Sequence, residues 1–452
     1  MTPSFENDFS GSKLAFYNNS KVSRKLSDFM SPGRNINHTS IWDFLLFGSM
    51  LPPHSPLQDV SLLYPGERIG NESHGLLYQE IPYAIKRLAP EQFVDEFDSC
   101  LKDYFAAHPG VPAVLLSGGI DSAIIASYMP KGSAFITWGG RGEATDDVQY
   151  ARISAEHFES GSHTMVFADY ERDLALYKEA VIALGFPMLF NSAVPFLRMA
   201  EAAREIGVTN WFMGQNADTL FMSYPAPVLA KRLHYLNTVL PLNPLALAPD
   251  RRRYLFSTPS IVRIFAYFKS LGVFPGDWIQ IPEAYFEEKE VLMDSMPART
   301  LDQRIIMLEE ILTESRRNQI CQNEIPALFG IDTLCPYYDQ RFVELALSMP
   351  SALRSKNRYG KQIFKDLARR RGVPAEIIDK RKTGLSYGFE DLVESGAHIP
   401  VWNSMEKDDD LNTFVRVRKI REERQDDPLT FIMLSSLHYW LELVARPQGL
   451  KC

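Results

Sequence analysis

The sequence predicts an α/β fold: a parallel, twisted sheet with helices on both faces, a small N-terminal domain and a helical C-terminal lobe. Short apolar runs typical of buried strands occur at 113–116, 134–138, 164–167 and 210–213. Segments with helical spacing separate these runs, and glycine closes several of them. Because strands that alternate with helices are typical of a parallel sheet covered on both faces, we expect the sheet within residues 109–452.

The first 108 residues carry weaker signals. Residues 1–40 are polar and rich in Ser and Asn, and they predict no particular element. Residues 41–48 predict a short helix that ends at a glycine, and 59–68 predict an extended segment that enters a Pro-Gly turn. A further helix is expected over 90–107. We therefore expect residues 1–108 to form a separate small domain.

The elements of residues 109–452 follow from local patterns. Helices are predicted over 123–129, from Thr145 with an acidic first turn, and then over 174–181, 193–206, 300–317 and 429–444. Residues 225–300 show helical spacing and many aromatic side chains, which are assigned to the core. The acidic run 408–410 is assigned to a loop.

Composition excludes several classes of protein. The 452 residues are 45% hydrophobic and 23% charged, which is an ordinary globular balance. A net charge of −8 disfavours polyanions, so no nucleic-acid partner is expected. No apolar run reaches the length of a membrane span, and residues 1–6 lack a signal-peptide pattern, so a cytoplasmic protein is expected. The four cysteines include no C-x-x-C pair and predict neither a zinc site nor a disulfide framework. The sequence carries no signal for an oligomeric state.

A glycine turn follows the first core strand. Ser117-Gly118-Gly119 leads into Asp121 and Ser122, which open an apolar helical segment. Glycines at such a turn let backbone N–H groups converge on an anion, to which a helix N-terminus adds its positive end. A phosphate cradle and a plain tight turn explain this spacing equally well. The turn is not a Walker A loop, because it has no G-x-x-x-x-G-K-[ST] pattern.

Residues 117–122 resemble the S-G-G-x-D-S signature of the PP-loop ATP pyrophosphatases. Enzymes of that family cleave ATP to AMP and pyrophosphate while they adenylate a carboxylate or another oxygen. The order of elements over 110–225, including the acidic helix start at Asp146 and Asp147, further resembles the synthetase domain of asparagine synthetases and β-lactam synthetases. The resemblance returns over 315–390. The fold expected from it is that of the adenine nucleotide α-hydrolases.

A second loop, Gly214 to Phe221, resembles the G-E-G-x-D-E-L-F pattern of asparagine synthetases, in which β-lactam synthetases place Tyr at the first variable position. The chain keeps Gly214, Asp218 and the Leu-Phe pair, but it has Gln215 and Asn216 in place of the glutamate and the second glycine. A neutral amide cannot act as a base. The change at Gln215 therefore argues against plain asparagine synthesis.

Two later segments extend the resemblance. Residues 330–339 resemble the family's G-x-E-x-R-x-P-F-L-D segment, with Leu334 near the arginine position. Residues 360–384 resemble its lysine-bearing helix and R-x-K loop, and they supply Lys361 and Lys382. This run is basic throughout, so a solvated or nucleic-acid-facing surface is the alternative interpretation. Lys380 and Arg381 are expected to stay in solvent.

The N-terminal part resembles the end of a glutaminase domain, in a truncated form. A similar Pro-Gly turn occurs there in class B asparagine synthetases. Their nucleophile would be a cysteine directly after the initiator methionine, where this chain has Thr2. Residues 1–108 are thus expected to be a glutaminase-like remnant that does not hydrolyse glutamine, and 109–452 a synthetase domain.

The resemblance implies ATP and Mg²⁺ as cofactors. Mg²⁺ takes one or two carboxylates together with phosphate oxygens, and Asp121 and Asp218 could supply them, although Asp218 alone could be a helix N-cap. The expected nucleotide-binding residues are Leu115, Ser117, Gly118, Gly119, Asp121, Ser122, Trp138, Gly214, Lys361 and Lys382. The expected catalytic residues are Lys382 at the oxyanion, Gln215, and Glu324 as a base, ranked ahead of Asp332. Glu324 as ordinary surface charge is the alternative.

The sequence therefore predicts an AMP-forming amide ligase that adenylates a carboxylate and lets an amine attack it. The expected substrate is a small amino-carboxylate or a peptide that closes a lactam or amide in specialised metabolism, such as antibiotic biosynthesis. An ammonia-dependent asparagine synthetase is the second interpretation. A tRNA-modifying enzyme would need a tRNA-binding surface and a catalytic cysteine pair, which the sequence does not show. A non-catalytic nucleotide-binding subunit is the remaining alternative, motivated by the changes at 215, 216 and 334.

Overall fold

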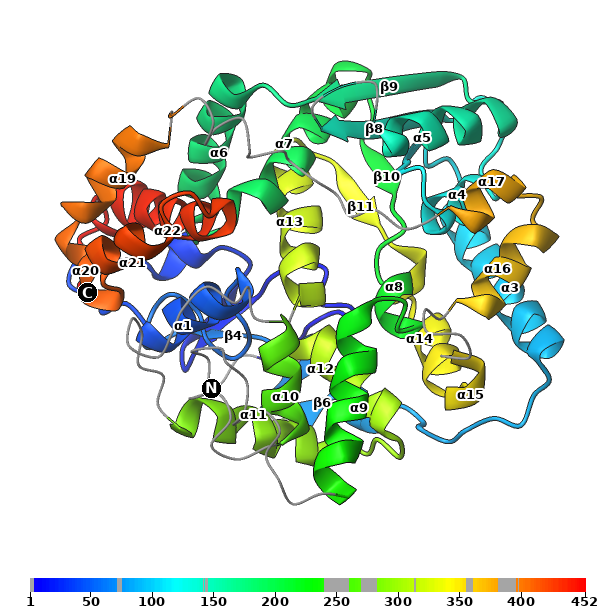
Figure 1. Cartoon of the computed structure of the whole chain (residues 1–452), viewed down its shortest axis with the longest axis horizontal. Coiled ribbons are helices and arrows are strands. Elements are labelled where there is room, and N and C mark those ends of the chain that lie inside the picture. The colour runs from blue at the N-terminus through cyan, green and yellow to red at the C-terminus, as the bar shows by residue number, and fades with distance from the viewer. Residues whose placement is uncertain are drawn as a thin grey trace.

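A computed structural model of the chain describes residues 4–70, 75–140, 142, 145–239, 260–269, 283–312, 314–354, 361–380, 396 and 398–452. A five-stranded sheet runs through its centre, with helices on both sides (Figure 1). Among the described residues, no helix is both long enough and apolar enough to cross a membrane.

All five strands of the central sheet are parallel. Their order is β11 (Asp332–Leu334), β10 (Asn210–Phe212), β7 (Ala113–Leu115), β8 (Ala134–Gly140) and β9 (Ser162–Phe167). The register pairs Ala113 with Ala134 on one side and with Trp211 on the other. The predicted parallel α/β fold is confirmed, and its four expected strands are present.

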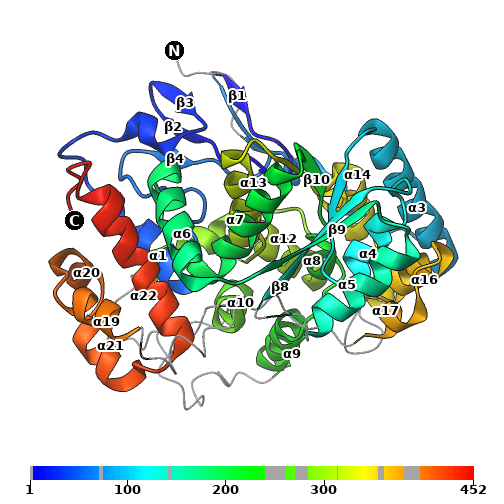
Figure 2. The same ribbon diagram turned by 90° about the horizontal axis from the view of Figure 1, so that it is seen from above.

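The sheet buries both faces, so successive side chains of a strand enter two different cores. Ala113 and Leu115 join the core that contains α7 (Phe190–Glu205) and α22 (Pro428–Trp440). Val114 and Leu116 join the core of α3 (Pro90–Ala107), α4 (Ile120–Ala126) and α16 (Gln362–Arg370). Figure 2 shows α4 and α5 (Asp146–His157) on one face of the sheet and α6 (Tyr170–Leu184) and α7 on the other.

The N-terminal part contains two small antiparallel sheets that the sequence did not predict. One consists of β1 (Phe5–Glu6), β5 (Glu67–Ile69) and β6 (Gly75–Leu76), and the other of β3 (Lys21–Ser23), β2 (Phe16–Asn18) and β4 (Ser61–Leu62). A 3₁₀ helix (Leu26–Phe29), α1 (His38–Phe47) and α2 (Leu77–Glu80) complete this part. Leu14, Phe16 and Ile41 belong to the same core as α7 and α22, so this part packs directly on the central sheet's helices.

Helices form the remainder of the described chain. Between the last two strands they are α8 (Ala217–Leu220), α9 (Pro225–Val239), α10 (Ile261–Lys269), α11 (Glu283–Ser295), α12 (Leu301–Leu312) and α13 (Glu314–Leu328). After β11 come a 3₁₀ helix (Pro336–Tyr338), α14 (Gln340–Leu347), α15 (Ser351–Arg354), α16, α17 (Ala375–Asp379), α19 (Ile399–Glu406), α20 (Asp409–Phe414), α21 (Val417–Arg424), α22 and a π-helical turn (Leu441–Ala445). The expected helical C-terminal lobe is therefore present.

One local prediction was wrong, and two were incomplete. The helix expected over 300–317 is present as α12 and α13 on either side of residue 313, and α13 continues to Leu328. The acidic run 408–410 begins a helix instead of a loop, because the Asp408 carboxylate accepts the backbone N–H of Leu411 as an N-cap. The fifth strand, β11, was not foreseen, since three residues carry too little period to indicate a strand.

One buried side chain ties the N-terminal part to α13. The Arg316 guanidinium donates to the carbonyl oxygens of Ser10 and Gly11 and to Gln319 Oε1. Hydrogen bonds from a charged donor are worth more than neutral ones, and losing the donor leaves these acceptors unpaired.

We expect Arg316→Met to lower the free energy of unfolding by about 2–3 kcal/mol, since that is the usual worth of a charged hydrogen bond. Chemical denaturation measures this loss, and limited proteolysis should show earlier cleavage near Gly11. Arg68→Gln is the matched control, because its two partners, Glu6 and Glu80, lie on the surface. Equal, small effects of both substitutions would contradict the anchoring role of Arg316.

Candidate active site

The two predicted loops meet at the point where the strand order reverses. The chain leaves β7 towards β8 and β9 and then returns to β10 on the other side of β7. Loops that follow neighbouring strands at such a point border one crevice at the carboxyl edge of the sheet. The contact is close: a Cβ on Gly214 would lie 3.1 Å from the carbonyl carbon of Asp121.

The glycine turn after β7 is held tightly. Gly118 has φ +66°, and a Cβ there would lie 2.5 Å from the carbonyl oxygen of Asp147 in α5. The Ser122 hydroxyl accepts the backbone N–H of Ser117 at 3.1 Å and donates to the carbonyl oxygen of Gly119 at 3.1 Å. The turn is therefore fixed from both sides, which suits a loop that presents backbone N–H groups to an anion.

Three charged side chains converge between the loops. Lys361 Nζ lies 2.6 Å from both carboxylate oxygens of Asp121 and 2.6 Å from Asp218 Oδ1. Burial lowers the pKa of Lys361, while the Asp121 carboxylate acts in the opposite direction. Lys361 stands before α16 with φ +67°, a conformation that costs free energy for a residue other than glycine. The N-cap alternative for Asp218 is wrong, because the N-cap residue of α8 is Asn216.

The donor set suits a Mg²⁺ ion. Asp121 and Asp218 face one point, as their common contact with Lys361 shows. Among the described residues, no group of three or more His, Cys, Asp or Glu side chains is placed to hold a metal. A site with two carboxylates, completed by phosphate oxygens and water, is the kind that Mg²⁺ prefers.

The residues of the second loop explain one departure from the family pattern. Asn216 has φ +85°, which asparagine tolerates better than most residues, so it can occupy the position of the second glycine. Gln215 Oε1 accepts from Gln322 Nε2 of α13 at 3.0 Å. The loop thus keeps a glycine-like backbone, while positions 215 and 216 carry neutral amides.

Tyr337 connects the two loops, a function that the sequence did not indicate. Its hydroxyl donates to the carbonyl oxygen of Asp121 at 2.8 Å, and its own carbonyl oxygen accepts from Asn216 Nδ2 at 3.1 Å. Tyr337 lies in the segment whose resemblance to the family's P-F-L-D was noted, and that was the only signal available for it.

The basic run after Lys361 is only partly described. Lys380 was expected in solvent, but its side chain is 6% exposed and its Nζ lies 2.6 Å from Asp147 Oδ1. The reason is α5, whose acidic first turn packs beside the glycine turn and offers this carboxylate. Lys382 and Arg381 lie outside the described residues, so the catalytic function of Lys382 stays a prediction.

Four further residues were predicted to bind the nucleotide or to act as a base. Leu115 ends β7 and Trp138 lies in β8, and both are buried. Glu324 Oε1 accepts the backbone N–H of Leu14 at 2.6 Å, and burial raises its pKa. Glu324 thus holds the N-terminal segment, and its function as a base stays a prediction. Asp332, the lower-ranked base, is 70% exposed and lies 3.5 Å from Lys13 Nζ.

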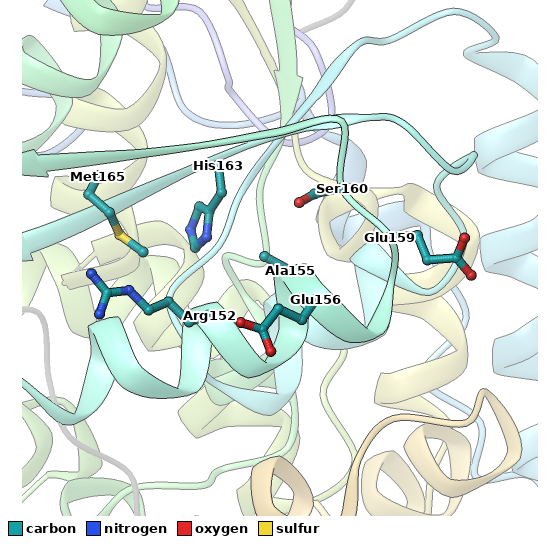
Figure 3. A pocket seen from close by; sticks show the side chains of 7 residues that line it. All are labelled: Arg152, Ala155, Glu156, Glu159, Ser160, His163 and Met165. Carbon is teal, nitrogen blue, oxygen red and sulfur yellow. The ribbon is translucent and has the colours of Figure 1, made fainter.

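A separate pocket of about 470 Å³ lies beside the edge strand β9 (Figure 3). Burial, and next the Arg152 guanidinium, lower the pKa of His163 in this pocket to about 4. The lining residues are Arg152, Ala155, Glu156, Glu159, Ser160, His163 and Met165. They come from the end of α5 and the beginning of β9, whereas the two loops leave the carboxyl ends of β7 and β10.

Comparison with known proteins points to one family. The family model for asparagine synthase matches residues 109–441, which include the central sheet, both loops and Lys361. No curated protein matches the chain.

We expect Gly118→Ala to lower the free energy of unfolding by about 2–3 kcal/mol, because alanine is strained at this φ and its Cβ would meet the Asp147 carbonyl. Thermal and chemical denaturation measure the effect. Gly119→Ala is the matched control in the same turn, since Gly119 has φ −98° and the nearest atom to its Cβ would be Ser117 Oγ at 3.4 Å. An equal loss in both variants would refute the tight packing of Gly118 against α5.

Lys361→Met leaves Asp121 and Asp218 facing each other without a cation. We expect a loss of about 3 kcal/mol, as is usual when one partner of a buried ion pair is removed. Added Mg²⁺ should then raise the melting temperature of this variant more than that of the unmodified protein, because the ammonium no longer competes. Lys380→Met is the control, since Lys380 pairs with Asp147 and not with either of the two carboxylates. A Mg²⁺ response that is the same in all three proteins would exclude the metal site.

Proposed function

The chain belongs to the asparagine synthase family and is an ATP-dependent amide-forming ligase, and from this premise we propose that it works through an acyl-adenylate. A substrate carboxylate oxygen attacks the α-phosphorus of ATP, the bond to the β-phosphate breaks, and pyrophosphate leaves. An amine nitrogen then attacks the acyl carbon and loses a proton, and AMP leaves. The observation that carries the proposal is the convergence of Asp121, Asp218 and Lys361 beside the glycine turn.

Each part of the crevice has a proposed function. The turn of Ser117, Gly118 and Gly119 binds phosphate oxygens through backbone N–H groups. Asp121 and Asp218 hold Mg²⁺, which when bound neutralises the charge of the triphosphate. Lys361, which contacts both carboxylates, is proposed to neutralise charge on the leaving pyrophosphate. Lys382 is proposed to stabilise the oxyanion, and such a preorganised donor is worth about 3–4 kcal/mol.

The amine is proposed to come from the substrate itself, as in β-lactam synthetases. One observation supports an intramolecular closure: Gln215 replaces the glutamate that asparagine synthetases have in this loop, and a neutral amide cannot act as a base. The left-handed backbone of Asn216, which the glycine of the family would provide, supports a catalytic protein over a degenerate, non-catalytic subunit.

We expect pyrophosphate release when the protein is incubated with ATP, Mg²⁺ and a panel of amino-carboxylates and short peptides. Asp121→Asn should reduce this release by about 100-fold or more, because it removes one of the two charges that face the metal. Asp103→Asn is the control, since that carboxylate is 57% exposed on α3 and pairs with Arg341.

The products separate the alternatives. Formation of ADP and phosphate would refute an acyl-adenylate. Formation of asparagine from aspartate and ammonium at the highest rate of the panel would establish the ammonia-dependent synthetase instead. Nucleotide binding with no product from any acid would favour the non-catalytic subunit.

A further inference from the structure

Four buried polar atoms lie around the second loop without a hydrogen-bond partner in the described part of the chain. They are Asn216 Oδ1, Glu310 Oε1, Gln322 Oε1 and the Tyr338 hydroxyl, here called the acceptor cluster. Their residues are between 2% and 5% exposed. Buried polar atoms nearly always have partners, and one that does not costs about 1–3 kcal/mol. Four such atoms on neighbouring elements therefore require a physical explanation.

The four members of the cluster come from the second loop and from three segments near it. The Asn216 side chain lies against the Glu310 carboxyl group, and the Tyr338 ring lies within the electrostatic range of the same carboxyl group. Gln322 contacts Gln215, the neighbour of Asn216 in the loop. Helices α12 and α13, the loop after β10 and the 3₁₀ helix before α14 thus contribute one member each.

The cluster has an excess of acceptors. Three of its four atoms are carbonyl or carboxyl oxygens, and the carboxyl group accepts hydrogen bonds only once it is ionised. Glu310 gains its negative charge above its raised pKa, and a bound cation favours this ionised form. Arg316 acts on Glu310 electrostatically, but its guanidinium donates to Ser10, Gly11 and Gln319. A ligand that suits the ionised cluster is therefore cationic and rich in hydrogen-bond donors.

We propose that the acceptor cluster binds an ammonium group, which has one positive charge and several N–H donors. Two sources share this chemistry: the primary amine of the substrate and free ammonium. The proposal deepens the proposed function and rests on it, because the bound group would be the amine that attacks the acyl-adenylate. It also assigns Glu310 as the residue that takes the proton from this amine.

The proton transfer follows from the surroundings of Glu310. Burial, and next the Glu309 carboxylate, raise the pKa of Glu310 to about 8, while Asn216 and Arg316 act in the opposite direction. A bound ammonium lowers this pKa because it favours the ionised carboxylate. The N–H bond then breaks, the proton moves to Glu310 Oε1, and the freed lone pair of the nitrogen attacks the acyl carbon. A base whose pKa lies near the working pH is efficient at this step.

The titratable and charged groups that act on Glu310 come from four segments of the described chain. They are Glu309 on α12, Arg316 on α13, Tyr78 on α2 and Tyr338. Burial raises the pKa of both tyrosines, so they stay neutral through the range in which Glu310 titrates. Binding of an ammonium group should therefore strengthen as the pH rises from 6 to 8.

The experiment measures the melting temperature of the full chain at constant ionic strength, without nucleotide. Ammonium and methylammonium chloride are compared with potassium and tetramethylammonium chloride. A salt at about ten times its Kd should raise the melting temperature by about 2 °C. We expect this shift with ammonium and with methylammonium. Potassium should give at most half of the shift, and tetramethylammonium, which has no N–H donor, should give none. A larger shift with methylammonium than with ammonium identifies the substrate amine as the source, and the reverse identifies free ammonium.

Two variants test the residues. Glu310→Gln keeps the shape of the side chain and should abolish the ammonium shift, and Asn216→Gly keeps the left-handed backbone and should reduce it at least threefold. Asp302→Asn is the matched control on the same helix, because the charge of the buried Asp302 carboxylate is neutralised by its ion pair with Lys231, and its variant should keep the full shift. An equal response to potassium and ammonium, or an undiminished shift in Glu310→Gln, would overturn the proposal.

Pyrophosphate release separates this proposal from the proposed function. If Glu310 only takes the proton, Glu310→Gln should keep pyrophosphate release within about threefold while amide formation falls by about 100-fold, as is usual for a lost general base. Loss of both to the same degree would overturn the assignment of Glu310. A protein that binds ammonium but releases no pyrophosphate with any acid would instead contradict the proposed function alone.

Discussion

The contact of one ammonium with two carboxylates organises the crevice. Lys361 and Asp121 are 240 residues apart in the chain, and Asp218 belongs to a third segment. Burying three charges costs free energy, and their mutual attraction repays it only when the geometry is good. The net charge of this group is −1, so an incoming cation is favoured before any substrate binds. The attraction between these three charges thus helps to hold β7, β10 and α16 in place relative to one another.

Backbone shape carries the second constraint. Because Gly118 has no Cβ, the backbone of α5 can pack directly against the turn. This packing places Asp147 beside Lys380. Asn216 gives the second loop the same left-handed freedom while it adds a side chain that reaches Tyr337 and Glu310. Two residues with positive φ therefore fix both loops, and the second also links its loop to the buried groups beneath.

The sequence predicted the elements whose signals are local. Helix α3 has the expected bounds, and the four short apolar runs became β7, β8, β9 and β10, because a buried parallel strand needs nothing more than a short apolar segment. The convergence of Asp121 with Asp218 was also foreseeable, since both follow strands that a parallel sheet brings to one edge. β11 and the N-terminal strands were not, because each has only two or three residues and owes its conformation to a neighbouring strand.

The residues that were missed act through tertiary contacts. Tyr337 is a core aromatic by its sequence, and only the approach of its hydroxyl to the Asp121 carbonyl reveals its second function. Lys380 looked like one cation in a basic run, yet its side chain is 6% exposed and its ammonium pairs with Asp147 on α5. Glu310 was indistinguishable from surface charge, because nothing in its helix shows that it is 2% exposed.

The neutral loop raises the question of where the proton of the amine goes. In a chain with glutamate at position 215, the loop itself could accept it, but Gln215 cannot, and its amide is held by Gln322. A base must then come from outside the loop and still reach the same place. Glu310, the proposed base, contacts Asn216 in the loop, whereas Glu324 Oε1 accepts the backbone N–H of Leu14. A neutral amide at position 215 and a buried carboxyl group beside position 216 therefore place the proposed base next to the loop instead of in it.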